Sequence, residues 1–302
     1  MEPMSTVTDE RWPSAASLLV YDPHTGYCNI PLLGAHTYAS SVSPRSPIPT
    51  ATAIRAALQS YSTYAIDADV DLLDHVRLLD RGDIHEPDSR GAIALSQALS
   101  RSSAEPWLLL GGDNALTWHA LRALAGAQLS SWGLITFDAH LDMREGRSNG
   151  SPVRQLLDEG LSGQHVVQIG LADFSNSASY AAEARRAGVT IVTREEVRRR
   201  SVLEVVAEAL AIAGADGRSV YVDIDVDVCD RSVVPGCPAA APGGLSADEL
   251  RRAVRAVAAD SRVRALDITE IDVARDSSDS RTVRLGALLV LEAALGIAKR
   301  AQ

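Results

Sequence analysis

Cysteine, lysine and long apolar segments are all scarce in this chain of 302 residues. The three cysteines, Cys28, Cys229 and Cys237, have neither the even number nor the density of a disulfide scaffold, so we expect a reduced, cytoplasmic setting. The most apolar segment, residues 285–298, is interrupted by Glu292 and is shorter than the roughly 20 residues that a membrane-spanning helix needs. The N-terminus is acidic and lacks an apolar core, so we expect no signal peptide. We therefore expect neither a membrane protein nor a secreted one.

Clusters of positive charge are also missing. Acidic residues outnumber basic ones by 39 to 29, which gives a net charge of −10, and no basic stripe or block of like charge occurs. Nucleic acid is therefore not an expected partner. No linker rich in proline, serine and glycine divides the interior, so we expect a single domain over residues 1–302, with residues 1–15 as a flexible extension.

Short apolar runs alternate with helical patterns along the whole chain. Nine such runs occupy residues 16–21, 30–34, 76–79, 107–110, 134–137, 166–170, 189–192, 220–225 and 263–268. Helical patterns such as 115–125 and 152–159 lie between them, which predicts an α/β fold with a parallel sheet covered on both faces. Capping boxes at 193–196 and 246–249 and the Ser151-Pro152 pair mark three helix starts. The proline-rich residues 40–52 are typical of a surface loop that leads into a helix.

Polar residues collect where four of these runs end. The sequence Gly-Gly-Asp-Asn at 111–114 follows one run, and Asp-Ala-His-Leu-Asp at 138–142 follows another. Asp225 and Asp227 end a third run, and Glu270 ends a fourth. Because ligands bind at the carboxyl ends of parallel strands, we expect these residues to converge on one acidic site.

The acids in this site alternate with other residues. Asp138, His140 and Asp142 would project from one face if the strand continued, and so would Asp225 and Asp227. Buried carboxylates are costly unless a cation is bound, and carboxylates with a single imidazole suit Mn²⁺ best. Four acids exceed what one ion needs, whereas two ions can share bridging carboxylates and activate one water. The alternative, that these are solvated turn residues, does not account for their joint pattern.

The segments 111–114, 138–142 and 223–245 resemble, in order, the three signature blocks of the arginase (ureohydrolase) superfamily, and the similarity spans residues 32–293. The resemblance implies a three-layer αβα sandwich around an eight-stranded parallel sheet. It also implies two Mn²⁺ ions per subunit and attack on an amidine or guanidine carbon by a hydroxide that bridges them. Members commonly form homo-oligomers, either trimers or hexamers.

The resemblance also implies the metal ligands, which are Asn114, Asp138, His140, Asp142, Asp225 and Asp227. Asp138 and Asp225 would bridge the two ions. Asn114 occupies a position that is usually histidine; its amide oxygen could coordinate more weakly, and its side chain could instead cap the helix that follows. Asp223 replaces the usual serine or threonine and could be a supporting acid outside the ligand set.

Several residues are similar to those of the formiminoglutamase subgroup. Members that hydrolyse guanidines carry a histidine where this chain has Asn149, and Arg144 suits the recognition of a carboxylate. The stretches 148–152 and 174–180 also resemble that subgroup. The resemblance therefore implies hydrolysis of N-formimino-L-glutamate, a small-molecule substrate, to L-glutamate and formamide.

Within this subgroup the roles of further residues follow by position. Asp227 or metal-bound solvent would protonate the leaving amine, and Glu270 would hold the cationic amidinium. The expected substrate contacts are Arg144, Asn149, Asn176, Ser177 and Glu270.

Alternatives remain for several of these assignments. Arg144 could be a plain surface residue, Glu270 could pair with Arg275, and Cys237 could be a reactive thiol or a small filler. For the whole chain, the alternatives are a guanidino hydrolase of the agmatinase or guanidinobutyrase type and a non-catalytic member of the same fold.

Overall fold

A computed structural model describes the chain except for residues 1–8, 10, 86, 101–105 and 302. Its centre is a nine-stranded sheet in the order β1-β5-β2-β6-β11-β10-β7-β8-β9, in which every neighbouring pair is parallel. The strands are β1 (Leu19–Val20), β2 (Cys28–Ala35), β5 (Val76–Asp83), β6 (Trp107–Gly111), β7 (Trp132–Phe137), β8 (Val166–Leu171), β9 (Thr190–Thr193), β10 (Ser219–Asp225) and β11 (Val263–Thr269). A separate antiparallel pair is formed by β3 (Tyr64–Ala65) and β4 (Val70–Asp71).

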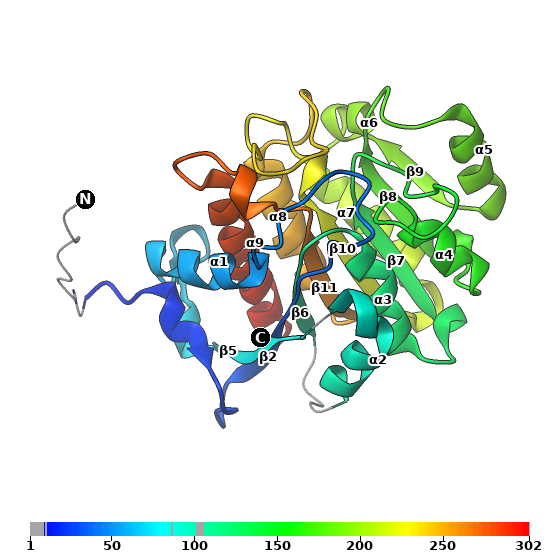
Figure 1. Cartoon of the computed structure of the whole chain (residues 1–302). Helices are drawn as coiled ribbons and strands as arrows, with labels where there is room; N and C mark the ends of the chain where they lie inside the picture. The colour runs from blue at the N-terminus through cyan, green and yellow to red at the C-terminus, as the bar shows by residue number, and fades with distance from the viewer. Residues whose placement is uncertain (1–8, 10, 86, 101–105, 302) are drawn as a thin grey trace.

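Helices cover both faces of the sheet, as Figure 1 shows. They are α1 (Thr50–Ala57), α2 (Pro87–Leu99), α3 (Ala115–Ala125), α4 (Pro152–Asp158), α5 (Ala178–Ala187), α6 (Arg194–Arg199), α7 (Val202–Ala213), α8 (Ala247–Ala258) and α9 (Arg281–Ala298). The buried side chains form two apolar clusters: one contains residues of α1, α7, α8 and α9, and the other contains residues of α2, α3, α4 and α5. Two cores on opposite faces of one sheet make the three-layer αβα arrangement.

The expected strands and helix starts are present. Each of the nine apolar runs overlaps one strand of the sheet. The sheet therefore has nine strands, one more than the eight that the family resemblance implied. The additional edge strand is β1, whose two residues pair with Leu78 and Leu79 of β5. Both predicted capping boxes form, at Thr193 and at Ser246, and the predicted Pro152 occupies the first turn of α4.

The sheet order explains why the polar clusters meet. The four strands that they follow, β6, β11, β10 and β7, are consecutive neighbours. Because these strands are parallel, their carboxyl ends lie along one edge of the sheet. The convergence predicted from the sequence is therefore a direct result of the topology.

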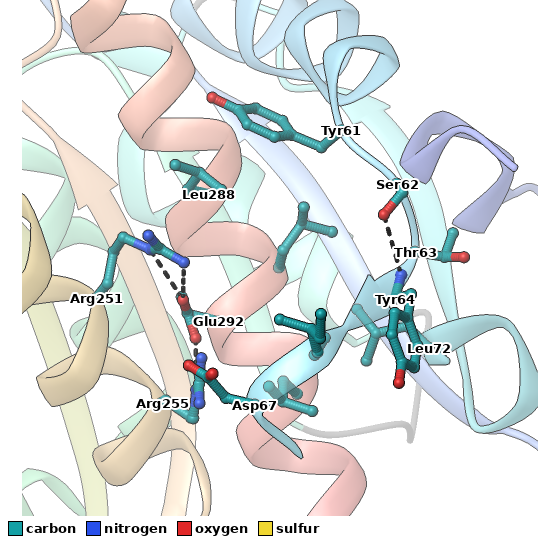
Figure 2. Close-up of a pocket in the computed structure, with 14 residues that line it drawn as sticks. Tyr61, Ser62, Thr63, Tyr64, Asp67, Leu72, Arg251, Arg255, Leu288 and Glu292 are labelled. Atoms are coloured by element: carbon teal, nitrogen blue, oxygen red, sulfur yellow. Dashed lines mark hydrogen bonds and ion pairs between the residues drawn. The ribbon is translucent and has the colours of Figure 1, made fainter. Parts of the chain in front are cut away.

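A different buried acid lies between α8 and α9, away from this edge. Glu292 is only 4% exposed, and its two oxygens accept hydrogen bonds from Arg251 Nε at 2.9 Å and Arg255 Nε at 2.6 Å. Figure 2 shows the two guanidinium groups around the carboxylate. They lie beside a cavity of about 220 Å³ that is lined by residues of α8, α9 and the β3–β4 region. Glu292, which interrupts the apolar segment 285–298, thus forms buried ion pairs that connect α9 to α8.

The chain ends and the apolar helices bear on two further expectations. The extension predicted at residues 1–15 falls largely on residues outside the described set; at its end, Ser14 caps a 3₁₀ turn and Ala15 is buried. Among the described residues, no helix combines the length and the apolar character needed to cross a bilayer.

Candidate metal centre and active site

Two aspartates make the same turn just beyond neighbouring strands. Asp138 Oδ1 accepts a hydrogen bond from the His140 backbone N–H at 2.6 Å, and Asp225 Oδ1 accepts one from the Asp227 N–H at 2.8 Å. Such side-chain bonds to the backbone two residues on are typical of Asx turns. The strand continuation on which the common face depended does not occur, because β7 ends at Phe137 and β10 ends at Asp225, where a 3₁₀ turn follows. The turns bring the side chains together instead.

The centre of the cluster consists of Asp138, His140 and Asp227. One ligand atom from each lies within 4.8 Å of the others. His140 Nδ1 is 2.7 Å from Asp227 Oδ2 and 3.5 Å from Asp138 Oδ1, and Asp227 Oδ1 accepts a hydrogen bond from Ala139 N–H at 3.0 Å. The loop after β7 is thus joined directly to the turn after β10.

Burial controls the charge of this cluster in the metal-free protein. Desolvation, together with the charge of Asp227, raises the pKa of Asp138 to about 7. Desolvation likewise raises the pKa values of Asp142 and Asp225 well above their usual range, with nearby carboxylates adding to the effect. For His140, desolvation opposes the charged form, but the charges and hydrogen bonds of Asp227 and Asp138 together outweigh it and raise the imidazole pKa to about 12. The surroundings of the His140 imidazole therefore favour a positive charge at this position.

The donor set fits a hard divalent cation. Asp138 Oδ2 is buried and has no hydrogen-bond partner among the described residues, so it is an acceptor that lacks its donor. Buried carboxylates with one imidazole match the ligands that Mn²⁺ prefers. Asp138, His140 and Asp227 are thus a candidate metal site, and Asp142 and Asp225 are nearby acids that could extend it to a second ion.

Asn114 is held by side chains of the same region. Its Nδ2 donates to Asp142 Oδ2 at 2.6 Å, and its Oδ1 accepts from the hydroxyls of Thr117 at 2.9 Å and Thr269 at 3.1 Å. The residue stands at the N-cap position of α3, but its side chain makes no capping hydrogen bond. The capping alternative is therefore wrong. Coordination by Asn114 stays a prediction, and it would require the amide oxygen to exchange partners.

Glu270 is held from three directions. Its Oε1 accepts hydrogen bonds from Asn114 N–H at 2.9 Å and Asn149 Nδ2 at 3.0 Å, and its Oε2 accepts one from Arg45 Nη1. The backbone of Glu270 has a positive φ of 67° and its N–H donates to the Gly112 carbonyl at 2.8 Å. The expected alternative partner, Arg275, pairs with Asp272 instead.

Arg45 is the residue that the sequence did not reveal. Its side chain is only 1% exposed, and its second nitrogen, Nη2, donates to the Gly112 carbonyl at 2.9 Å. The loop that carries it leads into α1 as predicted, yet it is more than a surface loop, because this side chain reaches the site. No periodic pattern or local motif distinguishes Arg45 from the other arginines.

A cavity of about 340 Å³ opens onto the cluster. Residues from the expected sets that line it are His140, Asp142, Arg144, Asn149, Asn176, Ser177, Asp225, Asp227 and Glu270. The exposed Arg144 side chain therefore shares a wall with the candidate metal ligands. Gly150 allows this position, because a Cβ at residue 150 would lie 2.8 Å from Arg144 Cδ.

Two of the expected substrate contacts also have local partners. Asn176 Oδ1 accepts from Leu141 N–H at 2.7 Å and its Nδ2 donates to the Ala139 carbonyl at 3.0 Å, so the side chain supports the loop after β7. Ser177 caps α5, where its Oγ accepts from Tyr180 N–H at 3.2 Å. Their contacts with a substrate stay predictions.

Two further residues, Asp223 and Cys237, lie buried near the cluster. Asp223 is fully buried opposite Asp267 in the β10–β11 register, and burial together with the Asp267 charge raises its pKa well above the usual range. Cys237 is also fully buried, and burial raises the pKa of its thiol, which favours the small filler over a reactive thiol.

Comparison with known proteins places the chain in a family. The sequence profile of the Arginase family matches residues 40–296. A formimidoylglutamase from Halalkalibacterium halodurans is 36% identical over 272 residues, which cover 86% of this chain and 84% of that protein.

Solved structures agree with this placement. The crystal structure of formimidoylglutamase from Bacillus subtilis superposes with a TM-score of 0.88 at 31% identity, over 99% of this chain and 96% of that one. A formiminoglutamase from Trypanosoma cruzi, in a structure with Mn²⁺, gives a TM-score of 0.83 at 26% identity, over 96% of this chain and 99% of that one. The chain therefore belongs to the arginase family.

Proposed function

We propose that this arginase-family hydrolase converts N-formimino-L-glutamate and water to L-glutamate and formamide. The carbon–nitrogen bond between the formimino carbon and the glutamate nitrogen breaks, and the oxygen of water is added to that carbon. The observation that carries the proposal is that Arg144, Glu270 and acids of the cluster line the same cavity. A guanidinium suits one of the two carboxylates of glutamate. The similarity to formimidoylglutamases over most of the chain supports the same substrate.

Two Mn²⁺ ions per chain are part of the proposal. Asp138 and Asp225 would be shared by both ions, His140 and Asp227 would serve one, and Asp142 would serve the other with the residue at 114. When bound, Mn²⁺ supplies a water that loses its proton near neutral pH, because metal binding lowers its pKa from about 15.7 toward roughly 7. Asp138 Oδ2, which has no hydrogen-bond partner in the described part of the chain, is the observation that supports a cation.

The side chains of the cavity would bind and orient the substrate. Glu270 would accept an N–H of the formimino group, and Arg144 would bind a carboxylate with help from the neighbouring Asn176 and Ser177. Asn149 would keep Glu270 in place, since its Nδ2 donates to that carboxylate. Asp227 lines the cavity, so it would take a proton from the attacking water and pass it to the departing glutamate nitrogen; metal-bound solvent is the alternative proton donor.

An assay of formamide and urea release separates the proposal from its alternatives. The protein is loaded with Mn²⁺ and given N-formimino-L-glutamate, arginine, agmatine and guanidinobutyrate in parallel. We expect formamide release from the first compound to exceed by far the urea release from the others. Urea release without formamide would identify a guanidino hydrolase, and fewer than two Mn²⁺ per chain with no product at all would indicate a non-catalytic member.

Three further expectations belong with this function. We propose that residues 1–302 act as one domain, that the chain assembles into trimers or hexamers, and that it works in the cytoplasm. Analytical ultracentrifugation tests the assembly, and limited proteolysis tests the single domain.

A further inference from the structure

The carboxylate of Glu270 is already largely occupied before any substrate arrives. A carboxylate offers about four lone-pair positions. Oε1 uses two of them for Asn114 N–H and Asn149 Nδ2, and Oε2 uses one for Arg45 Nη1. One position therefore remains, on the oxygen that faces Arg45.

Arg45 also neutralises this acid. The two side chains are 1% and 4% exposed, so their attraction is only weakly screened by solvent. Arg45 is not among the residues that line the cavity, whereas Glu270 is. The direct route from Arg45 to a substrate is therefore through Glu270, which Arg45 contacts.

The loop around Arg45 holds the guanidinium in place. Val42 N–H donates to Asn149 Oδ1 at 2.8 Å, Ser41 Oγ donates to Asp113 Oδ2 at 2.6 Å, and Ser46 N–H donates to Asp272 Oδ2 at 3.2 Å. These contacts anchor the loop on both sides of Arg45. Its guanidinium spans from Glu270 to the Gly112 carbonyl, so it is fixed at two ends.

From this geometry we infer that Arg45 is a positioning residue that selects the class of substrate by limiting what Glu270 can accept. The inference rests on the proposed function, in which Glu270 holds the substrate nitrogen. A guanidino group carries two terminal NH₂ groups and binds a carboxylate best through two parallel N–H donors. A formimino group carries one terminal NH₂ and a C–H. The single free position and the neutralised charge of Glu270 therefore suit formimino compounds and disfavour guanidino compounds.

The test compares two substitutions of Arg45 with a matched control. Arg45→Ala removes the guanidinium, and Arg45→Gln removes its charge but keeps an N–H donor for the Gly112 carbonyl. Arg281→Ala removes the same charge from an exposed ion pair with Asp279, where the Arg281 side chain is 51% exposed. The kcat/KM values for N-formimino-L-glutamate and for guanidino compounds are measured on all three proteins loaded with Mn²⁺.

Both Arg45 variants should change the substrate preference. We expect the ratio of urea release to formamide release to rise at least tenfold in Arg45→Ala and Arg45→Gln, and to stay at the wild-type value in Arg281→Ala. A fall in both activities by the same factor, with the ratio unchanged, would show that Arg45 is only structural. If Arg45→Ala does not fold, Arg45→Gln supplies the same comparison.

A second measurement needs neither metal nor turnover. Calorimetric titration of the metal-free proteins with guanidinium chloride at millimolar concentration reports whether Glu270 has become free. We expect binding to Arg45→Ala to be at least tenfold tighter than to the wild type or to Arg281→Ala. Equal binding by all three proteins would overturn the inference.

The two proposals can fail separately. Formamide release by the wild type, with an unchanged product ratio in the Arg45 variants, would leave the function standing and remove the role of Arg45. Urea release without formamide by the wild type would overturn both. If the wild type releases neither product, the function fails, and guanidinium binding by Arg45→Ala alone would still support the effect of Arg45 on Glu270.

Discussion

Two regions of the molecule bury carboxylates in opposite ways. Between α8 and α9, Glu292 gives each oxygen to an arginine, so one acid has two cationic partners. At the carboxyl ends of β7 and β10, four aspartates share one imidazole, and Asp138 Oδ2 has no partner among the described residues. The first region is complete without a ligand, whereas the second lacks positive charge.

This difference separates acids that hold the fold together from acids that prepare a site. Breaking a buried ion pair leaves a charge without compensation and costs stability. Removing one of several crowded carboxylates instead lowers the repulsion in the metal-free protein and weakens metal binding. The two kinds of acid should therefore respond in opposite ways to substitution and to Mn²⁺.

The largest effect is expected from Asp225→Ala. Loss of this acid should remove hydrolysis by several orders of magnitude, because activation of water near neutral pH depends on an intact metal centre. The metal-free variant should unfold at the same temperature as the metal-free wild type or a higher one. Calorimetric unfolding and a product assay measure both, and turnover at the wild-type rate would falsify the two-metal hypothesis.

Glu292→Ala should instead lower the stability of the fold and leave the activity unchanged. Breaking a buried pair costs about 3–5 kcal/mol, and we expect about 3 kcal/mol here because Arg251 and Arg255 remain 37% and 28% exposed. Chemical denaturation measures the loss, and kcat/KM at low temperature should stay at the wild-type value. Glu292→Gln, which keeps the volume and one acceptor, is the matched control and should lose less. A loss of activity in the folded variant would contradict the distinction between acids that stabilise the fold and acids that bind metal.

The stabilising effect of Mn²⁺ should grow with pH. Asp138 has a pKa of about 7 in the folded protein, above the ordinary value of 3.8, so its burial destabilises the metal-free fold increasingly as pH rises through that interval. Mn²⁺ removes this penalty and competes with fewer protons at higher pH. With free Mn²⁺ at 100 times its Kd the stabilisation is about 2.7 kcal/mol. Melting temperatures with and without Mn²⁺ at pH 5.5, 6.5 and 7.5 should diverge, and a constant difference would argue against the acid cluster as the site.

The smallest effect is expected from Asn114→His. An imidazole can coordinate Mn²⁺ directly, but the variant loses the amide bond to Asp142 and the acceptor for Thr117 and Thr269. These changes oppose each other, so activity should stay within about tenfold of the wild type. Metal content by atomic absorption and steady-state kinetics report the two effects independently. Loss of metal from the variant would show that Asn114 matters mainly through its hydrogen bonds.

Local patterns were sufficient for the strands and for the acids. The nine strands are visible as apolar runs because a sheet covered on both faces requires apolar residues at nearly every position. The clustering of Asp138, His140 and Asp227 was predictable because parallel strands end at one edge of the sheet. The turns that follow these strands were missed, since Asp138 and Asp225 bond to their own backbone and end the alternation.

Contacts between distant segments could not be predicted in the same way. Arg45 reaches Glu270 across 225 residues, and nothing near Arg45 in the sequence encodes that meeting. Arg275, five residues from Glu270, was the alternative partner considered, because no topological rule brings the loop before α1 to the end of β11. The fold instead brings an early loop against the end of β11.

The same loop has a consequence for how the chain acquires its function during synthesis. Arg45, Ser46 and Thr50 bond to residues 270–272, so the loop receives these partners only after nine-tenths of the chain has been made. Closing so long a segment is entropically costly and comes late in folding. The central strand β11, which joins β6 to β10, is made just before these partners. We therefore expect ribosome-bound chains shorter than about 270 residues to lack both the complete sheet and an ordered entrance to the cavity.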